Sequence, residues 1–409
     1  MGPIMLGILF VALAAAEGVT VTIPQTWIYG LLAAIFTALM GSASKMAWPH
    51  VKAHFGSVAR LRRAERALDE KSPGLWLAPS IPIEPPPDYE RVIAKSIPII
   101  VVANLKGGVG KTTAVANLIG HYGLKKNKRV LALDMDFQGS LSVVVLSDAE
   151  YKNSLEQQAD GSPSKAAQLV SGRDAQWLRD TSVDVDGVHQ ARCVPSYYTL
   201  SIAENRVMVE WLIGKRKEDT RYLLANVLHN KAIQDRFDII LIDAPPRLTT
   251  ACVQSLCAAT HVLVPTILDG LSAEASGGFV AQLVSNEKIW PHLRLLGLFG
   301  NMTELLTFNA AGEPPDGRLK DYEADARQAA IDATTVALEA GGATLRAAQN
   351  SAMMPIECFI PDKTELGRTA GHGIAYRLQG GSQATQDLSR AFDRLGDEID
   401  RRILASKKK

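Results

Sequence analysis

The sequence predicts a doubly wound α/β domain with a mainly parallel sheet, and three observations lead to this fold class. Short runs rich in Ile, Val and Leu recur between residues 97 and 302, with helical stretches between them. The runs are continuous rather than alternating, as in strands buried on both faces. Polar or glycine-rich residues follow the runs, where ligands bind in such sheets. The expected strands are Ile97–Asn104, Arg129–Asp136, Phe237–Ala244, His261–Ile267 and Leu295–Met302.

Two uncharged apolar segments, Ile4–Ala16 and Trp27–Ala43, precede this domain. The second approaches the ~20 residues that a helix needs to span a bilayer. The first is short, and a signal peptide is disfavoured because no Lys or Arg stands before it. A basic excess over residues 45–71 marks the cytoplasmic side. We therefore expect a transmembrane anchor over residues 1–46, as one helix or a helical hairpin, at the cell inner membrane. The alternative is a buried helical hairpin in a soluble protein.

The remaining chain divides into a linker, a large cytoplasmic domain and a tail. Residues 47–95 combine a basic helix with a proline-rich stretch, which has six prolines between Ser72 and Asp88. Proline resists both helix and central strand, so this stretch is expected to be an extended spacer. The main domain is expected over residues 96–395. Apolar residues at helical spacing in Gln383–Ser406 predict an amphipathic helix, whose end forms residues 396–409 together with a basic tail.

Charge and cysteine content exclude several classes of protein. Lys and Arg number 44 against 43 Asp and Glu, so the net charge of +1 rules out a wholesale polyanion binder. A hydrophobic content of 47% excludes a disordered or fibrous chain. The four cysteines form no CxxC pair, which disfavours a zinc or iron–sulfur site and favours small core residues in a reducing compartment. These cysteines are Cys193, Cys252, Cys257 and Cys358.

The clearest chemical signal follows the first expected strand, where residues 104–113 read NLKGGVGKTT. The glycines allow successive backbone amides to converge on one anion, in front of a helix N-terminus. Lys111 would reach the β- and γ-phosphates, and Thr112 would offer its hydroxyl to Mg²⁺. The loop departs from the general phosphate-loop pattern, because Leu105 stands where its first glycine belongs and Lys106 adds a second lysine.

The string KGGVGKTT resembles the deviant Walker A phosphate loop of the ParA/MinD family of dimeric P-loop ATPases. The resemblance covers about Ser96–Leu395 and is weak over Tyr151–Arg192 and Thr303–Ile356. It implies ATP and Mg²⁺ as ligands and a homodimer that forms on ATP binding. It also implies that Lys106 reaches into the partner's site and stabilises the transferring phosphoryl group, alongside Lys111. The implied nucleotide contacts of the loop are Gly107, Gly108, Val109, Gly110, Lys111, Thr112 and Thr113.

Later motifs follow in the order of this family. Asp134 and Asp136 resemble its first switch, which implies that Asp136 orients the attacking water and Asp134 supports the Mg²⁺ shell. Asp243 closes a Walker B-like strand and would face the metal together with Thr112. The residues after it, Ala244–Pro246, resemble the second switch. The positions where the family contacts adenine correspond to Asn301, Pro361 and Asp362.

The resemblance and the apolar N-terminus together imply a membrane-tethered ATPase, Mg²⁺-dependent and coupled to dimerisation, that recruits or releases a partner. The partner would be an unidentified protein or DNA at the inner face of the membrane. Non-specific DNA binding through Arg401, Arg402 and Lys407–Lys409 is less favoured, since the net charge is near zero. One alternative is a tyrosine-kinase-like P-loop protein of polysaccharide export, although no tyrosine cluster follows Tyr376. Another is a scaffold that ATP stabilises as a dimer without hydrolysis.

Overall fold

The computed structural model describes residues 62, 64–70, 75–304, 319–341, 345, 352–362, 374 and 383–407. The anchor expected over residues 1–46 lies outside these ranges. Within them, no helix combines the length and the apolar character that crossing a bilayer requires.

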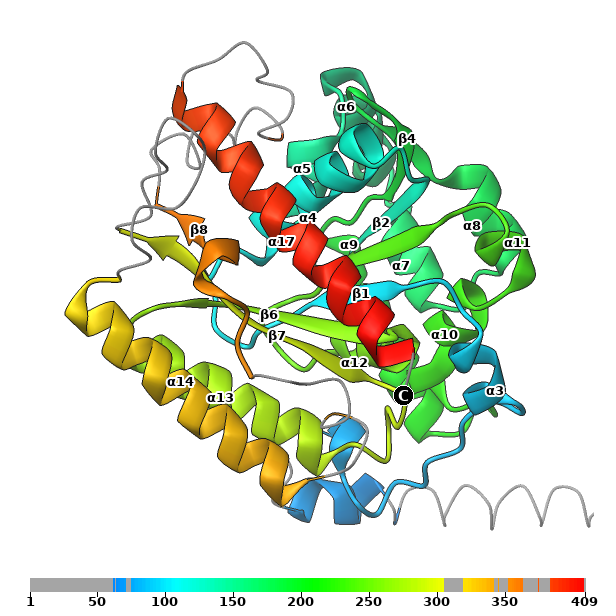
Figure 1. Ribbon diagram of the computed structural model, residues 1–409. Coiled ribbons are helices and arrows are strands. Elements are labelled where there is room, and N and C mark those ends of the chain that lie inside the picture. The colour runs from blue at the N-terminus through cyan, green and yellow to red at the C-terminus, as the bar shows by residue number, and fades with distance from the viewer. Residues whose placement is uncertain are drawn as a thin grey trace, which may run out of the picture. The chain divides into compact units, whose positions relative to one another are not determined.

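The described strands form one eight-stranded sheet in the order β3-β4-β2-β5-β1-β6-β7-β8 (Figure 1). Neighbouring strands are parallel except for the antiparallel pair β3–β4. This confirms the mainly parallel sheet that the sequence predicts. The strands are β1 (Ile99–Val102), β2 (Val130–Asp134), β3 (Val183–Val185), β4 (Val188–Val194), β5 (Ile239–Asp243), β6 (His261–Ile267), β7 (Arg294–Thr303) and β8 (Ile360–Pro361).

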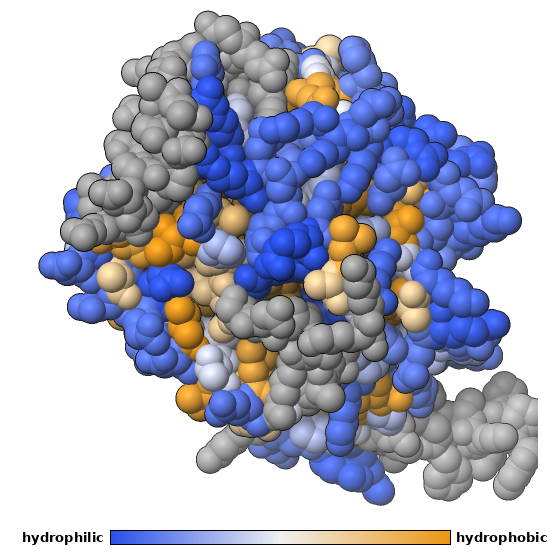
Figure 2. Space-filling model, viewed as in Figure 1, coloured by the Kyte–Doolittle hydropathy of each residue, from blue (hydrophilic) through white to orange (hydrophobic). Residues whose placement is uncertain are grey.

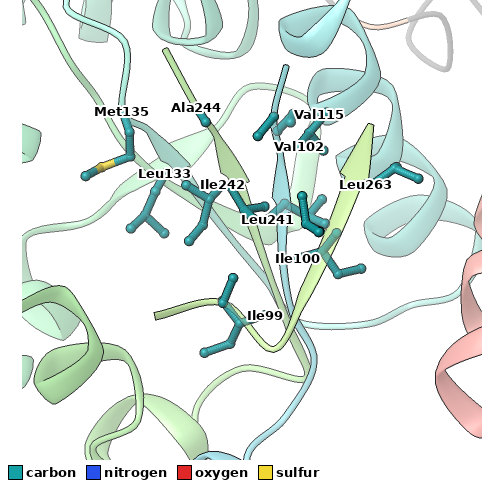
Figure 3. Close-up of a cluster of buried hydrophobic side chains, with 14 of the residues drawn as sticks. Ile99, Ile100, Val102, Val115, Leu133, Met135, Leu241, Ile242, Ala244 and Leu263 are labelled. Carbon is teal, nitrogen blue, oxygen red and sulfur yellow. The ribbon is translucent and has the colours of Figure 1, made fainter. Parts of the chain in front are cut away.

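The hydrophobic core surrounds the three central strands. Every residue of β1, β2 and β5 is buried, which is why these strands read as continuous apolar runs. Neighbouring side chains such as Ile99 and Ile100, or Leu241 and Ile242, point to different sides of the sheet (Figure 3). Full burial of each Ile or Leu side chain contributes about 1.5–3 kcal/mol, so these strands form a rigid platform for the loops that follow them.

Helices cover both faces of this sheet. The chain passes from β1 to β2 through α4 in the direction of β3, and from β5 to β6 through α12 in the direction of β8. Because such crossovers are right-handed, α4 and α12 lie on opposite faces. The helices are α3 (Tyr89–Ala94), α4 (Lys111–Gly120), α5 (Ser140–Val145), α6 (Asp148–Ala159), α7 (Lys165–Val170), α8 (Ala175–Thr181), α9 (Thr199–Leu212), α10 (Leu223–Leu228), α11 (Lys231–Gln234), α12 (Thr250–Ala258), α13 (Gly270–Ser285), α14 (Asp321–Ala340) and α17 (Gln383–Lys407).

Residues 75–95, which we call the strap, pack against the domain instead of forming an extended spacer. Trp76 is 4% exposed and stacks on Trp211 of α9 at 5.1 Å between ring centroids. Arg221 is 1% exposed, and its guanidinium donates to the carbonyl oxygens of Trp76 (3.1 Å) and Pro82 (2.5 Å) while pairing with Asp219 (2.6 Å). Proline lacks a donor, but its carbonyl still accepts, so a buried arginine can hold this segment. The packed region therefore begins well before Ser96.

The C-terminal helix α17 confirms the predicted amphipathic pattern, with Leu388, Phe392 and Ile399 fully buried. Figure 1 shows it running across the sheet, and hydrophilic side chains predominate on this face of the molecule (Figure 2). Arg402, a candidate DNA contact, is 7% exposed and donates to Glu398 (2.7 Å) and to backbone carbonyl oxygens. Arg401 pairs with Glu398 at 2.6 Å. The less favoured basic patch for DNA therefore loses Arg402, whose side chain binds within the domain.

Candidate functional site

The loop between β1 and α4 takes a backbone course that requires glycine at two positions. Gly108 and Gly110 have φ values of +76° and +84°, in the left-handed region that residues with a Cβ avoid. At Gly110 a Cβ would also lie 1.9 Å from Asn301 Nδ2. Asn301 is 2% exposed, and its Nδ2 donates to the carbonyl oxygen of Val109 at 2.9 Å. The Asn301 side chain, near the end of β7, thus holds the loop through this hydrogen bond.

A cavity of about 530 Å³ opens above this loop at the carboxyl end of the sheet. This is the edge where parallel α/β sheets bind ligands. The cavity brings together the loop and the first switch, as the sequence predicts. The predicted site residues that line it are Gly107, Gly108, Gly110, Lys111, Thr112, Thr113 and Asp136.

Lys111 and Thr112 begin α4 and are held in place by polar contacts. Lys111 is 8% exposed, and its Nζ donates to the carbonyl oxygen of Lys106 at 3.0 Å. Burial lowers the pKa of this lysine, while the nearby carboxylates of Asp243 and Asp136 act in the opposite direction. Thr112 Oγ1 donates to Asp243 Oδ2 at 2.7 Å. The first turn of α4 is thereby tied to the end of β5.

Asp134 and Asp243 are paired in register at the ends of β2 and β5, and both are buried. Burial, and then the neighbouring Asp134, raises the pKa of Asp243 well above its ordinary range. Burial also raises the pKa of Asp134, against hydrogen bonds from the Ser142 hydroxyl (2.7 Å) and amide (2.8 Å). Within the described part of the chain, Asp243 Oδ1 has no hydrogen-bond partner. A divalent cation, which prefers oxygen ligands, would stabilise the ionised form of these two neighbouring carboxyl groups.

Lys106 lies apart from the cavity lining. Its Nζ contacts the hydroxyl of Ser272 and lies 3.5 Å from Asp269 Oδ1. Asp269 caps α13 by accepting from the Ser272 amide at 2.7 Å and from its hydroxyl at 2.6 Å. In a single chain, the lysine that the resemblance assigns to the partner's site is therefore docked on the start of α13.

The three residues expected to contact adenine are not among the described residues that line the cavity. Asn301 supports the loop, as described above, while Pro361 belongs to β8 and the Asp362 amide donates to the carbonyl oxygen of Thr303 at 2.7 Å. Met302 lines the cavity instead, with a φ of +58° that is unusual for methionine.

Eight lining residues were not among the predicted site residues, namely Ala116, Asn117, Gln138, Ser140, Val143, Val144, Pro246 and Met302. Pro246 belongs to the second-switch string and Gln138 follows Asp136 of the first switch by two residues, so both motifs contained a signal for them. Met302 carried no signal beyond its place at the end of a strand.

Comparison with known proteins identifies the family. Residues 97–288 match the family model AAA_31, described as an AAA domain. The chain is 30% identical over 205 residues to the chromosome-partitioning ATPase Soj of Thermus thermophilus, which covers 50% of this chain and 68% of Soj. It is also 30% identical over 190 residues to a protein designated replication protein A of Rhizobium rhizogenes, covering 44% of this chain. It spans only 43% of that relative's length.

Solved structures agree on the fold. The McdA structure without nucleotide from Cyanothece has a TM-score of 0.54 at 17% identity and covers 75% of this chain and 99% of its own. The pNOB8 ParA structure has a TM-score of 0.52 at 18% identity and covers 75% and 98%. Because the match to Soj reaches 30% identity over two thirds of that protein, the chain belongs to the ParA/MinD family of P-loop ATPases.

Proposed function

We propose that this protein is a membrane-tethered ATPase switch, which binds Mg–ATP in the 530 Å³ cavity, hydrolyses it as a dimer and recruits or releases a partner. The observation that carries the proposal is the Thr112–Asp243 hydrogen bond at the base of the loop, next to the buried Asp243 Oδ1, which has no hydrogen-bond partner among the described residues. A hydroxyl and a carboxylate at the foot of a phosphate loop are the protein ligands that a phosphate-bound Mg²⁺ uses.

Each residue of the site then has a role that follows from its position. Thr112 and Asp243 would hold the Mg²⁺ ion, which when bound would supply positive charge to the phosphates. Asp134 is fixed by Ser142 beside Asp243, where it would support the Mg²⁺ shell through water. Lys111 would exchange its contact with the Lys106 carbonyl for the phosphates. Asp136 lines the cavity, where it would orient the attacking water.

Dimerisation is proposed to complete the site. Lys106 would leave Ser272 and Asp269 and place its ammonium beside the phosphoryl group bound by the partner subunit. A second cation at that point stabilises the charge that spreads over the transferring group. Hydrolysis would then depend on the dimer, and ADP would favour its separation.

The cellular role is proposed from the N-terminal sequence and from the family. Two apolar segments and a basic flank support an anchor at the inner membrane, with the ATPase domain in the cytoplasm. Soj is named as a chromosome-partitioning ATPase, so positioning of a cargo is the family-level expectation. A protein partner is favoured over DNA, because Arg402 is buried against Glu398.

Phosphate release by the full-length protein in lipid nanodiscs tests the enzymatic part. Lys111→Ala should abolish Mg–ATP binding, whereas Asp136→Ala should bind Mg–ATP and lose turnover. The control is Lys152→Ala, an exposed lysine of α6 that does not line the cavity. Equal rates in the parent and both site variants would refute the ATPase.

Membrane tethering and partner recruitment need separate measurements. Cell fractionation followed by carbonate washing should leave the full chain in the membrane and release a version that lacks residues 1–46. Pull-down with the Asp136→Ala variant, in the presence of ATP, should retain the partner more strongly than the parent protein does. Recovery of DNA alone would favour a partitioning role, and equal extraction of both versions would contradict the anchor.

A further inference from the structure

A second cavity, of about 190 Å³, lies among α6, α7, α8 and the turn from β4 to α9. Figure 1 shows these elements grouped around β4, at the end of the sheet that carries β3 and β4. Its lining contains one ammonium group, from Lys165, and no carboxylate. This part of the chain coincides with Tyr151–Arg192, where the resemblance to the family is weak.

Lys165 lines the cavity and has no counterion among the described residues. Its side chain is partly buried, and burial lowers its pKa. Glu150 is the carboxylate that acts on Lys165 most strongly, but it forms no ion pair with it. Across the described residues, Lys165 makes neither a hydrogen bond nor a salt bridge. A partly desolvated ammonium with no partner favours an anion as its neighbour.

Several groups in this lining can donate hydrogen bonds. Tyr197 is 7% exposed and interacts with the Ser154 side chain, and burial raises its pKa to about 12, so its hydroxyl keeps its proton at neutral pH. Gln168 uses one amide hydrogen on the Pro163 carbonyl oxygen (3.0 Å) and retains a second. Trp177 adds an aromatic wall, and the Arg173 guanidinium lies 5.9 Å from its ring centroid. Donors beside one ammonium suit a carboxylate or a phosphate group.

One wall of this cavity is connected to the first switch by consecutive hydrogen bonds. The Pro195 carbonyl oxygen accepts from the Ala166 amide at 3.0 Å, next to Lys165. The following residue, Ser196, donates its amide to Ser142 Oγ at 3.0 Å. Ser142 Oγ in turn donates to Asp134 Oδ2 at 2.7 Å. These hydrogen bonds connect the wall of the cavity to Asp134, which stands beside Asp243.

We propose that this cavity binds a small organic anion bearing a carboxylate or phosphate group, and that its occupancy adjusts nucleotide binding through residues 195–197. The volume is below the ~300–1,000 Å³ typical of sites for drug-sized ligands, so the ligand has few heavy atoms. The binding half of this proposal is independent of ATP hydrolysis. The regulatory half rests on the proposed nucleotide site.

Calorimetric titration of the full-length protein, with the nucleotide site saturated by Mg–ADP, tests the binding half. Succinate and inorganic phosphate serve as probes, and neutral succinamide is the matched control. We expect saturable binding of at least one anion and none of succinamide. Lys165→Gln should weaken binding at least tenfold, whereas Lys152→Gln, at an exposed position of α6, should leave it unchanged.

Tyr197→Phe provides a second variant that keeps the aromatic ring and removes the hydroxyl, and it should weaken anion binding. The absence of saturable binding, equal binding of succinamide, or equal affinity in the Lys165→Gln and parent proteins would overturn the site. Thermal melting of each variant confirms that it is folded.

The regulatory half is tested by measuring the Kd of a slowly hydrolysed Mg–ATP analogue with and without the anion. Coupling requires that the two ligands change each other's affinity by the same factor. We expect a factor of at least three in the parent protein and a factor of one in Lys165→Gln. A factor of one in both overturns the regulation. Failure of the analogue to bind at all would instead count against the proposed nucleotide site.

Discussion

Gly110 lies where the phosphate loop contacts the end of β7, and two independent features require glycine at this position. Its φ of +84° disfavours any side chain, and its α-carbon lies against the carboxamide of Asn301. The motif predicted the glycine from the need for a tight turn around phosphate. The contact with Asn301 could not be predicted, because it depends on how the end of β7 is placed relative to a loop almost two hundred residues earlier.

Gly110→Ala should destabilise the nucleotide-free protein by about 1–3 kcal/mol, from backbone strain and the contact with Asn301. Urea unfolding measures the change, and Gly107→Ala is the control, since an added Cβ there meets nothing within 4 Å. The double variant Gly110→Ala/Asn301→Ala should recover part of the loss. Equal stability of the Gly110→Ala and Gly107→Ala proteins would contradict this account.

The buried carboxylates give the site a pH dependence whose sign follows from the raised pKa of Asp243. A carboxyl group with a raised folded-state pKa binds its proton more tightly in the folded protein. Its contribution to stability is therefore complete below the unfolded pKa, about 4, and is lost as pH rises through the folded value.

Without metal, Asp243→Asn should accordingly gain stability relative to the parent as pH rises from about 4 to about 8, reaching about 1–3 kcal/mol. Denaturant midpoints of both proteins across this range give the difference, and Asp160→Asn, an exposed carboxylate, should show no such trend. The same substitution should remove the dependence of nucleotide affinity on Mg²⁺. A constant difference between the two proteins at all pH values would rule out the raised pKa.

At the scale of elements, the sequence predicted the strands that are buried on both faces of the sheet, and it missed strands that are partly exposed or very short. β1, β2 and β5 are continuous apolar runs, so their assignment needed no tertiary information. β4 carries exposed residues in its middle, and β8 has two residues, so neither has a distinct pattern. The strap was unpredictable for another reason, since Arg221, which binds it, lies more than a hundred residues away.

Arg221→Ala should destabilise the protein by about 3–5 kcal/mol, because it leaves Asp219 buried without its partner and frees the strap. Unfolding by urea measures the loss, and limited proteolysis should show faster cleavage between residues 75 and 95. Arg129→Ala is the matched control, since its pair with Asp238 is 48% and 39% exposed and contributes at most about 1 kcal/mol. Adding Asp219→Ala to Arg221→Ala should recover part of the stability. Similar losses in both single variants would show that the strap is not held by this arginine.

At the scale of the whole molecule, we expect a second copy of the chain to complete the nucleotide site, as in the dimer that the family resemblance implies. Among the described residues that line the cavity, Lys111 is the only lysine, and Lys106 is docked on Ser272 and Asp269. The sequence predicted both lysines from the loop, but it could not show where Lys106 rests in a single chain. That position depends on α13, which the loop motif does not include.

Lys106→Gln should leave Mg–ATP affinity within about threefold of the parent and reduce turnover by at least tenfold, because a dimer would lack the second ammonium at the phosphoryl group. Sizing by light scattering with a slowly hydrolysed ATP analogue should show a dimer for the parent and a weaker one for the variant. Asp269→Asn separates docking from catalysis, since it removes the anion 3.5 Å from Nζ and keeps the lysine. That variant should dimerise at lower protein concentration than the parent while retaining turnover. Lys152→Gln controls for loss of charge alone. If Lys106→Gln retains full turnover as a dimer, the lysine takes no part in hydrolysis across the dimer.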